Sequence, residues 1–301
     1  MTTNVSFVIP TYNGVHLLQK HLRSVFAAAR KGDEIIIVDD ASTDESVAWL
    51  EKTYGLTISS CEVTDAFCSV SIYKGVGLKV LINRTNRRFA SSCNRGVMSA
   101  KAELVVLLNN DVSPDTHFLA SLLPHFEDPD VFAVGCKELA ASENDKEYGR
   151  SSMTFSRGMF IHWREPDQSG TDTAWVAGGS GMFRKSMWEE LGGFDLDYTP
   201  AYWEDIDLSW RAKQRGWKVL FEPASIVHHV HESTNASVFG KNRVEIMGYK
   251  NQLLFTWKHA KGGALVSHIF WFPYHLVFTT IRSRGRFAIG LWRASIQVLL
   301  A

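Results

Sequence analysis

Short apolar runs alternate with segments of helical periodicity between residues 5 and 108. The apolar runs cover residues 5–9, 34–38, 79–83 and 103–108, and the helical patterns cover 15–30, 44–54 and 89–100. Strands separated by helices at this spacing predict βαβ units and a parallel sheet. The runs lack alternating polar residues, which is typical of a sheet covered on both faces. We therefore expect an α/β fold with a mostly parallel sheet flanked by helices.

The rest of the chain is less regular. Residues 55–77 interrupt the pattern and predict an insertion, in the form of a hairpin. After Trp175 we expect a strand at 181–184, a helix at 186–191, a helix at 204–215 and a strand at 218–221. Since no repeat or low-complexity linker is visible, we expect one main domain over residues 1–238 and a helical tail over 239–301.

The composition excludes some functions. The formal net charge is zero, which removes any bulk argument for nucleic-acid binding. None of the four cysteines forms a C-x-x-C pair, which fits a reducing compartment. The first ten residues lack a basic segment followed by a long apolar run, so we expect a cytoplasmic protein.

Three polar clusters follow predicted strands, at residues 10–14, 39–44 and 109–111. In an open α/β sheet, ligands bind beyond the carboxyl ends of the strands, so these clusters predict one pocket. A G-x-G-x-x-G fingerprint and a Walker A loop are both absent after the first run. Asp39 or Asp40 is placed to accept a hydrogen bond from a nucleoside, and Asp111 to bind a divalent cation that holds a diphosphate.

An ordered set of motifs resembles the family 2 glycosyltransferases, which have the GT-A fold. The motifs are VSFVIPTYNG at 5–14, VDDASTD at 38–44, NRRFASSCNRG at 86–96, LNND at 108–111, GGFD at 192–195 and EDIDL at 204–208. The resemblance covers residues 4 to 235 and points to the bacterial cell-surface polysaccharide branch, which contains rhamnosyltransferases. Two positions depart from the family pattern. Arg88 stands where a glycine is expected, and Asn109 replaces the first acid of the D-x-D motif.

The resemblance implies a nucleotide-binding half over residues 1–112 and an acceptor-binding half over residues 113–238. The donor residues it implies are Pro10, Thr11, Tyr12, Asn13, Asp39, Asp40, Arg88, Asn94, Asn109, Asn110 and Gly179. The acceptor residues it implies are Gly193, Phe194, Asp195 and Trp203.

The same resemblance implies a divalent cation, Mn²⁺ or Mg²⁺. Asp111 is its expected carboxylate ligand. The family has a histidine ligand five residues before a serine, and His228 and Ser233 have that spacing, with His231 as the second choice. A histidine among oxygen ligands favours Mn²⁺.

Asp205 is the base that the resemblance favours. Adjacent helical residues point about 100° apart, so only one of Glu204 and Asp205 can face an acceptor, and the choice between them stays open. Asp207 and Arg211 are spaced i,i+4, and we expect them to pair on the surface.

The implied reaction is an inverting transfer of a sugar from a dTDP- or UDP-linked donor to a hydroxyl of a glycan or lipid-linked glycan. Two alternatives remain, a sugar-phosphate nucleotidyltransferase and a non-catalytic nucleotide-sugar-binding protein.

The segment 264–281 is apolar and rich in aromatic residues, and Arg282, Arg284 and Arg286 follow it. Because Pro273 interrupts the segment, we expect it to be too short to span a bilayer. We expect it to lie at the inner surface of the cell membrane as a peripheral attachment. The alternative is that it packs against the domain or against a second subunit in a homodimer.

Overall fold

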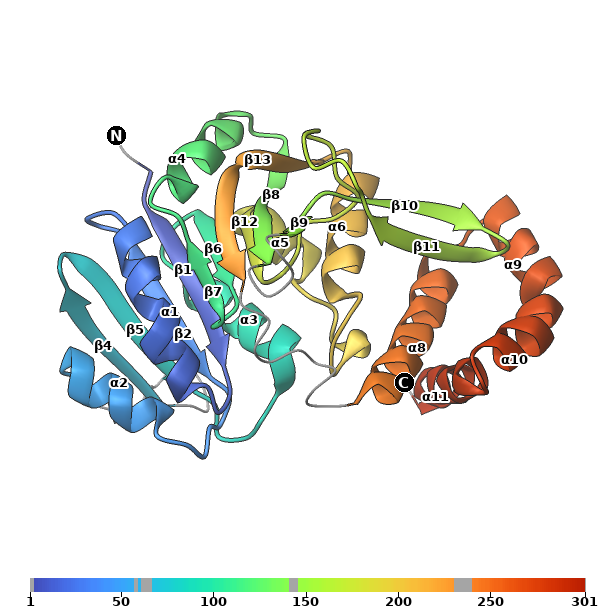
Figure 1. The fold of residues 1–301 in the computed structure, drawn as a ribbon, viewed down its shortest axis with the longest axis horizontal. Helices are drawn as coiled ribbons and strands as arrows, with labels where there is room; N and C mark the ends of the chain where they lie inside the picture. The colour runs from blue at the N-terminus through green and yellow to red at the C-terminus, as the bar shows by residue number, and fades with distance from the viewer. Residues whose placement is uncertain (1–2, 57–58, 61–66, 141–145, 230–239, 301) are drawn as a thin grey trace.

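The computed structural model describes residues 3–56, 59–60, 67–140, 146–229 and 240–300. A twisted sheet with strand order β3-β4-β5-β2-β1-β6-β12-β8-β13-β7 forms the body of the molecule, and β9 pairs with β8 (Figure 1). The four neighbouring strands β5, β2, β1 and β6 are parallel to one another, whereas β12 is antiparallel to both β6 and β8. The α/β fold with a mostly parallel central sheet is therefore confirmed.

The strands of the sheet are β1 (Val5–Thr11), β2 (Glu34–Asp39), β3 (Ser59–Ser60), β4 (Phe67–Tyr73), β5 (Val76–Ile82), β6 (Leu104–Leu108), β7 (Val112–Pro114), β8 (Val131–Ala140), β9 (Lys146–Tyr148), β12 (Ser180–Arg184) and β13 (Lys218–His229). A separate antiparallel hairpin consists of β10 (Ser151–Ser156) and β11 (Met159–Arg164). It extends from the sheet toward the C-terminal helices (Figure 1).

The helices of the main domain are α1 (Val15–Ala28), α2 (Ser46–Tyr54), α3 (Arg88–Ser99), α4 (Phe118–Leu122), η1 (Leu123–Glu127), α5 (Lys185–Leu191), η3 (Leu196–Tyr198) and α6 (Glu204–Gln214). The tail contains α8 (Lys241–His259), α9 (Gly263–Tyr274), the π-helical turn η4 (His275–Thr279), α10 (Thr280–Arg282) and α11 (Arg286–Leu300).

Apolar side chains fill three cores. On one face of the sheet, α1, α2 and α4 cover β-strand residues such as Ile35 and Val106. On the other face, α3, α5 and α6 cover residues such as Val8 and Val105. The third core joins α6 and the β10–β11 hairpin to α8 and α11, with Phe255 fully buried in it. The tail is thus packed against the main domain through an apolar core of its own.

Two expected elements differ from the structure. The interruption at residues 55–77 does contain a hairpin, but its second strand is β5 itself, which begins at Val76 and pairs antiparallel with β4. The strand expected to end at Phe221 continues to His229, because a bulge between Glu222 and Ile226 lets β13 resume its pairing with β8.

The expectation that Pro273 makes the apolar segment too short was wrong. The helix continues through Pro273 into η4 and α10, and its 20 residues from Gly263 to Arg282 are long and apolar enough to cross a membrane. Only 11% of the most apolar 18-residue stretch of this helix is buried. The helix meets this criterion by length and composition only.

Candidate active site

A cleft of about 1040 Å³ lies at the carboxyl ends of the parallel strands. One side is formed by the segments that follow β1 and β6 and by the start of α3; it is called the donor side because most of the residues expected to bind the donor lie there. The other side is formed by β11, the segment before β12 and the start of α6; it is called the acceptor side because Trp203, an expected acceptor residue, lies there. The sequence-predicted residues that line the cleft are Pro10, Thr11, Tyr12, Asn13, Asp40, Arg88, Asn109, Asn110, Asp111, Gly179, Trp203, Glu204 and Asp205. The fold therefore brings together residues that are nearly 200 positions apart in the chain.

Close packing fixes the segments on the donor side. Asn110 Nδ2 donates to Thr11 Oγ1 at 2.8 Å, and Asn109 N donates to Gly179 O at 2.9 Å. A Cβ at Gly179 would lie 2.4 Å from Asn109 Nδ2. Only glycine allows this approach, and Gly179 therefore belongs to the wall of the cleft.

The carboxylate of Asp40 accepts three hydrogen bonds on the donor side. Its Oδ1 accepts from Asn83 Nδ2 at 2.7 Å and from the backbone N of Arg87 at 2.8 Å, and its Oδ2 accepts from the backbone N of Arg88 at 2.8 Å. Asp39 lies deeper and is absent from the cleft lining. Its Oδ1 accepts from Ser42 N, while its buried Oδ2 has no partner within the described part of the chain. The predicted nucleoside contact of Asp40 is thus combined with a role in holding the start of α3.

We expect Asp40→Ala to weaken donor binding and also to lower the melting temperature. The substitution leaves three hydrogen-bond donors without their acceptor, and each such loss costs about 1–3 kcal/mol when the group is buried. Calorimetric titration of the donor together with thermal unfolding checks this. Asp44→Ala on the same loop is the control, and equal effects of both substitutions would contradict a specific role for Asp40.

Asp111 faces His229 at the end of β13. His229 Nε2 lies 3.2 Å from Asp111 Oδ1, and His229 Nδ1 lies 3.4 Å from Glu138 Oε2. His228 points the other way, with Nε2 3.0 Å from Asp115 Oδ1 and a side chain that is 45% exposed, against 11% for His229. The assignment of His228 beside Asp111 is therefore corrected to His229. Successive side chains of a strand alternate between faces, so only one of the two histidines can face the cleft. His231 and Ser233 lie outside the described residues.

His229 lies between the carboxylates of Asp111 and Glu138. Burial alone would lower the pKa of His229, but its hydrogen bonds to Asp111 and Glu138 raise it to about 10. Burial would raise the pKa of Glu138, yet its contacts with His229 and Ser180 hold it at about 2. Asp111 and His229 provide one oxygen and one nitrogen ligand, a set that suits Mn²⁺. The described residues contain no group of three side chains that could hold a metal ion.

Glu204 and Asp205 begin α6 on the opposite side of the cleft. Asp205 Oδ1 accepts from the backbone N of Ile206 at 2.8 Å, and its Oδ2 accepts from Gly178 N at 3.4 Å. Glu204 Oε2 is buried and has no partner among the described residues. Burial raises the pKa of Asp205 to about 6, although the two backbone hydrogen bonds oppose the shift. Burial and the charge of Asp205 raise the pKa of Glu204 to about 8. Burial thus favours the protonated form of both carboxyls, and the charge of Asp205 adds to this effect at Glu204.

Asp207 is not on the surface, contrary to expectation. Its side chain is 1% exposed and accepts from Arg211 Nε at 2.6 Å, from His259 Nε2 at 2.7 Å and from Tyr198 Oη at 3.1 Å. His259 belongs to α8, so this ion pair ties the tail to the helix that carries Asp205. The i,i+4 pairing is confirmed and its location is corrected, because α8 covers this face of α6.

Several residues that the sequence predicted to contact the donor or the acceptor lie behind the cleft wall. Phe194 is buried against Phe89 and Trp188, and Asn94 accepts from its backbone N and donates to its backbone O, both at 2.8 Å. Asp195 pairs with Lys258 of α8. Gly193 is buried beside Asn94. These residues hold the segment before α6 in place and do not line the cleft, because their side chains are used for packing.

The acceptor side of the cleft is aromatic, which the sequence did not predict. His162, Trp163, Trp175 and Tyr202 line it. His162 lies between Trp175 and Trp203, with ring centroids 5.1 and 4.9 Å apart. The signal for this wall was present, because Arg157-Gly158 stands between two runs rich in aromatic and β-branched residues, which is typical of a hairpin.

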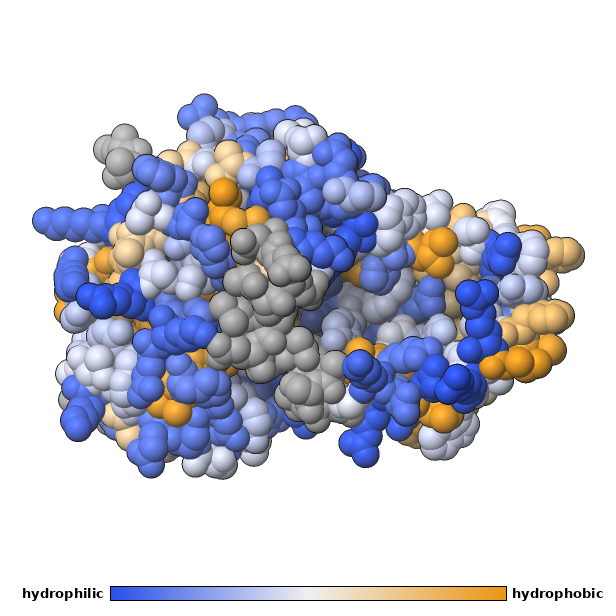
Figure 2. Space-filling model, viewed as in Figure 1, coloured by the Kyte–Doolittle hydropathy of each residue, from blue (hydrophilic) through white to orange (hydrophobic). Residues whose placement is uncertain are grey.

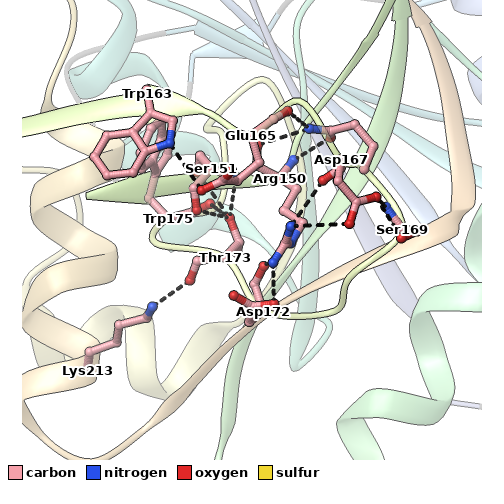
Figure 3. Close-up of polar contacts among 11 residues, drawn as sticks. Arg150, Ser151, Trp163, Glu165, Asp167, Ser169, Asp172, Thr173, Trp175 and Lys213 are labelled. Carbon is pink, nitrogen blue, oxygen red and sulfur yellow. Dashed lines mark hydrogen bonds and ion pairs between the residues drawn. The ribbon is translucent and has the colours of Figure 1, made fainter. Parts of the chain in front are cut away.

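The loop from β11 to β12 completes the aromatic wall, and Arg150 holds it. The guanidinium donates to the backbone O of Asp167 at 3.1 Å and of Asp172 at 3.0 Å, and it pairs with the Asp172 carboxylate at 2.6 Å. Figure 3 shows Arg150 at the centre of these contacts, with Trp163 hydrogen-bonded to Glu165 through its indole N at 3.1 Å. The loop is thereby fixed at Asp167 and Asp172, which lie between Trp163 and Trp175 in the chain.

Comparison with known families agrees with this geometry. The model of the family described as "Glycosyl transferase family 2" matches residues 6–192, and that of "Glycosyl transferase family group 2" matches residues 104–299. The chain belongs to glycosyl transferase family 2. The first match contains the donor side of the cleft, and the second contains α6 and the tail helices.

Individual proteins are similar at low identity. A pre-mycofactocin glycosyltransferase of Mycobacterium tuberculosis is 26% identical over 230 residues, which are 76% of this chain and 43% of that protein. The chain thus spans less than half of that relative. The O-antigen chain rhamnosyltransferase RfbN of Salmonella typhimurium is 22% identical over 241 residues, 78% of this chain and 69% of that protein.

The fold is similar to that of a solved mannosyltransferase from Pyrobaculum calidifontis in complex with GDP-Man and Mn²⁺. The TM-score is 0.60 at 16% identity, and the match covers 99% of this chain and 85% of the other. This likeness confirms the GT-A fold expected from the sequence motifs.

Arg88 marks the departure from the family 2 motif, in which a glycine is expected. Its φ is +73°, a left-handed conformation that glycine adopts freely. Asn13, Tyr202 and Trp203, which also line the cleft, have positive φ as well. Such conformations cluster at functional sites because the surrounding contacts hold them there. The backbone at Arg88 therefore has a conformation that glycine adopts freely, while its side chain adds a cation to the cleft.

We expect Arg88→Gly to stabilise the fold and weaken donor binding at the same time. Glycine removes the left-handed penalty of about 1–2 kcal/mol, although its greater freedom in the unfolded chain offsets about 0.5–1 kcal/mol of this gain. The loss of a guanidinium from the donor side should raise the dissociation constant for the nucleotide-sugar. Thermal unfolding and calorimetric titration measure the two effects separately. Arg87→Gly, whose φ is −101°, is the matched control and should only destabilise.

Proposed function

We propose that this protein is a metal-dependent inverting glycosyltransferase that moves a sugar from a nucleotide-sugar to a hydroxyl of a glycan or lipid-linked glycan. The observation that carries the proposal is the arrangement of the one cleft. Asp111 and His229 offer an oxygen and a nitrogen ligand from the sheet, and the carboxyl of Asp205 lines the opposite side of the cleft at the start of α6.

In the proposed reaction Asp205 accepts the proton of the acceptor hydroxyl while the oxygen attacks the anomeric carbon. The bond from the anomeric carbon to the diphosphate breaks, and the diphosphate leaves on the side of Asp111. Asp111 and His229 would hold a divalent cation, which would supply Lewis-acid stabilisation of the leaving group. A single displacement inverts the anomeric centre, whereas retention in glycoside hydrolases uses a second carboxylate as nucleophile.

Glu204 has a different role in this proposal. Burial and the charge of Asp205 raise the pKa of Glu204, which favours its protonated form and makes Asp205 the proposed base. The acceptor sugar would lie against Trp163, Trp175 and Tyr202, because the faces of sugar rings carry C–H groups that pack on aromatic rings. These three residues replace Gly193, Phe194 and Asp195 as the proposed acceptor contacts.

A panel of nucleotide-sugars, with thermal-shift readout in the presence and absence of Mn²⁺, tests the donor side. We expect one sugar nucleotide to stabilise the protein only with the metal, and dTDP- or UDP-linked sugars remain the predicted class. Product analysis then separates the alternatives. A nucleotidyltransferase would form pyrophosphate from a sugar phosphate, and a binding protein would hold the donor without turnover. Membership of family 2 and the presence of Asp205 in the cleft favour transfer over both.

A further inference from the structure

The helix formed by α9, η4 and α10 buries its two histidines and exposes most of its apolar side chains. His268, His275 and Ser283 are buried. The exposed face consists of Leu265, Val266, Ile269, Phe270, Leu276, Val277, Phe278 and Ile281. No charged side chain occurs from Gly262 to Ile281. A helix on the surface of a soluble protein has the opposite polarity, so this face, hereafter the apolar face, is built to be covered.

The buried side of this helix is fixed to the turn of the β10–β11 hairpin. His268 Nδ1 donates to Gly158 O, and His275 Nε2 donates to Arg157 O, each at 2.7 Å. A Cβ at Gly158 would lie 2.8 Å from His268 Cα, so the hairpin touches the helix backbone. Arg157 lies over the Tyr274 ring, 5.7 Å from its centroid. The polar residues of the helix therefore face the protein, and the apolar face is directed away from it.

Positive charge borders the apolar face. Arg282 and Arg284 are exposed at the end of the helix, and Arg157 is exposed at the hairpin turn that contacts it. Glu245 is the only acidic residue from position 240 onward, and it already pairs with Arg286 at 2.6 Å. Figure 2 shows hydrophobic atoms gathered at the end of the molecule formed by α9 and α10, with hydrophilic atoms beside them.

We propose that the apolar face lies in the headgroup region of an anionic membrane, with the helix parallel to the surface. The neighbouring arginines match the charge of anionic lipids. A second copy of this chain fits the face less well, because a symmetric contact would bring the same arginines together.

The contacts with the hairpin also exclude a helix that crosses the bilayer while docked as in this structure. His268 and His275 are the sixth and thirteenth of the 20 residues, so both would lie inside the hydrocarbon core, which is about 30 Å thick, if the helix crossed. The hairpin turn and the Arg157 guanidinium would then lie at that depth as well. A charge at the bilayer centre is costly, whereas a helix parallel to the surface leaves the hairpin in water.

The β10–β11 hairpin connects the helix of the apolar face to the cleft. Its turn contacts the helix at Gly158, and its other end, Trp163 and Arg164, lines the acceptor side of the cleft. The six residues of β11 span about 20 Å, at about 3.3 Å per residue. If the proposed function holds, the acceptor hydroxyl is within about 20 Å of the headgroups, as in a short lipid-linked glycan.

Co-sedimentation of the full chain with vesicles tests the proposal. Vesicles of phosphatidylcholine mixed with phosphatidylglycerol should bind the protein, and binding should weaken with salt. Phe270→Asp, at a position 75% exposed, should reduce the partition coefficient about tenfold or more, because burial of an aromatic ring is lost. Arg284→Ser should reduce it about fivefold. Ile72→Asp is the matched control, since Ile72 is 79% exposed on β4 at the opposite end of the molecule, and it should bind as the unchanged chain does.

Three results would overturn the proposal. The first is equal vesicle binding by Phe270→Asp and Ile72→Asp. The second is resistance of the bound protein to extraction by alkaline carbonate, which would show a crossing helix. The third is a dimer in solution that Phe270→Asp dissociates without any vesicle binding by the unchanged chain, which would make a second copy the occupant. Donor binding by the same variants is independent of these results, so failure of the proposed function would appear separately.

Discussion

Replacement of Asp205 by Asn should reduce sugar transfer about 10²–10⁴-fold, the usual cost of removing a general base. Donor affinity should remain unchanged, because the substitution is isosteric and the cation ligands lie on the other side of the cleft. Single-turnover rates with the donor found in the panel, together with the donor dissociation constant, measure the two quantities. A fall in both by the same factor would instead indicate that Asp205 only shapes the cleft.

The pH profile gives a second test of the same residue. The base must be ionised, and the pKa of Asp205 is raised to about 6, so kcat/KM should fall as the pH decreases through that value. Glu204→Gln is the control. If Asp205 is the base, this variant should retain the acidic limb of the profile. If Glu204→Gln is inactive and Asp205→Asn is nearly normal, Glu204 is the base.

Replacement of Asp111 by Asn, or of His229 by Ala, should abolish the Mn²⁺-dependent part of donor binding. Removing a residue that hydrogen-bonds to a metal ligand typically lowers metal affinity about 10–100-fold. Removing a ligand itself should lower the affinity further. Titration of Mn²⁺ in the presence of the nucleotide-sugar checks this. Because the cation and a proton compete for His229, Mn²⁺ affinity should also fall as the pH decreases.

His228→Ala is the matched control for the metal site. His228 is adjacent in the same strand but points to Asp115. It should therefore leave metal-dependent binding intact. If His228→Ala loses metal-dependent binding while His229→Ala binds normally, His228 is the metal ligand, as the sequence spacing suggested.

The sequence by itself determined the fold class and most of the donor side. Apolar runs without polar alternation can only be buried strands, and the polar residues that end them must meet at one edge of a parallel sheet. For this reason Thr11, Asn110 and Asp111 were correctly expected to lie in one pocket. These inferences depend on local periodicity and on chain connectivity, which a single sequence records.

The tertiary structure decided the contacts that depend on how distant elements pack. His229 faces Asp111 because a bulge after Glu222 lets β13 continue to that point, and the direction of each side chain follows from the alternation along that strand. Asp207 is buried because α8 covers it, although its spacing with Arg211 suggests an exposed pair. The orientation of the helix from Gly263 to Arg282 is set by His268 and His275 on the hairpin turn, and no local pattern in the sequence indicates that contact. Local sequence fixes which residues can lie on one face of an element, whereas packing between elements fixes what that face meets.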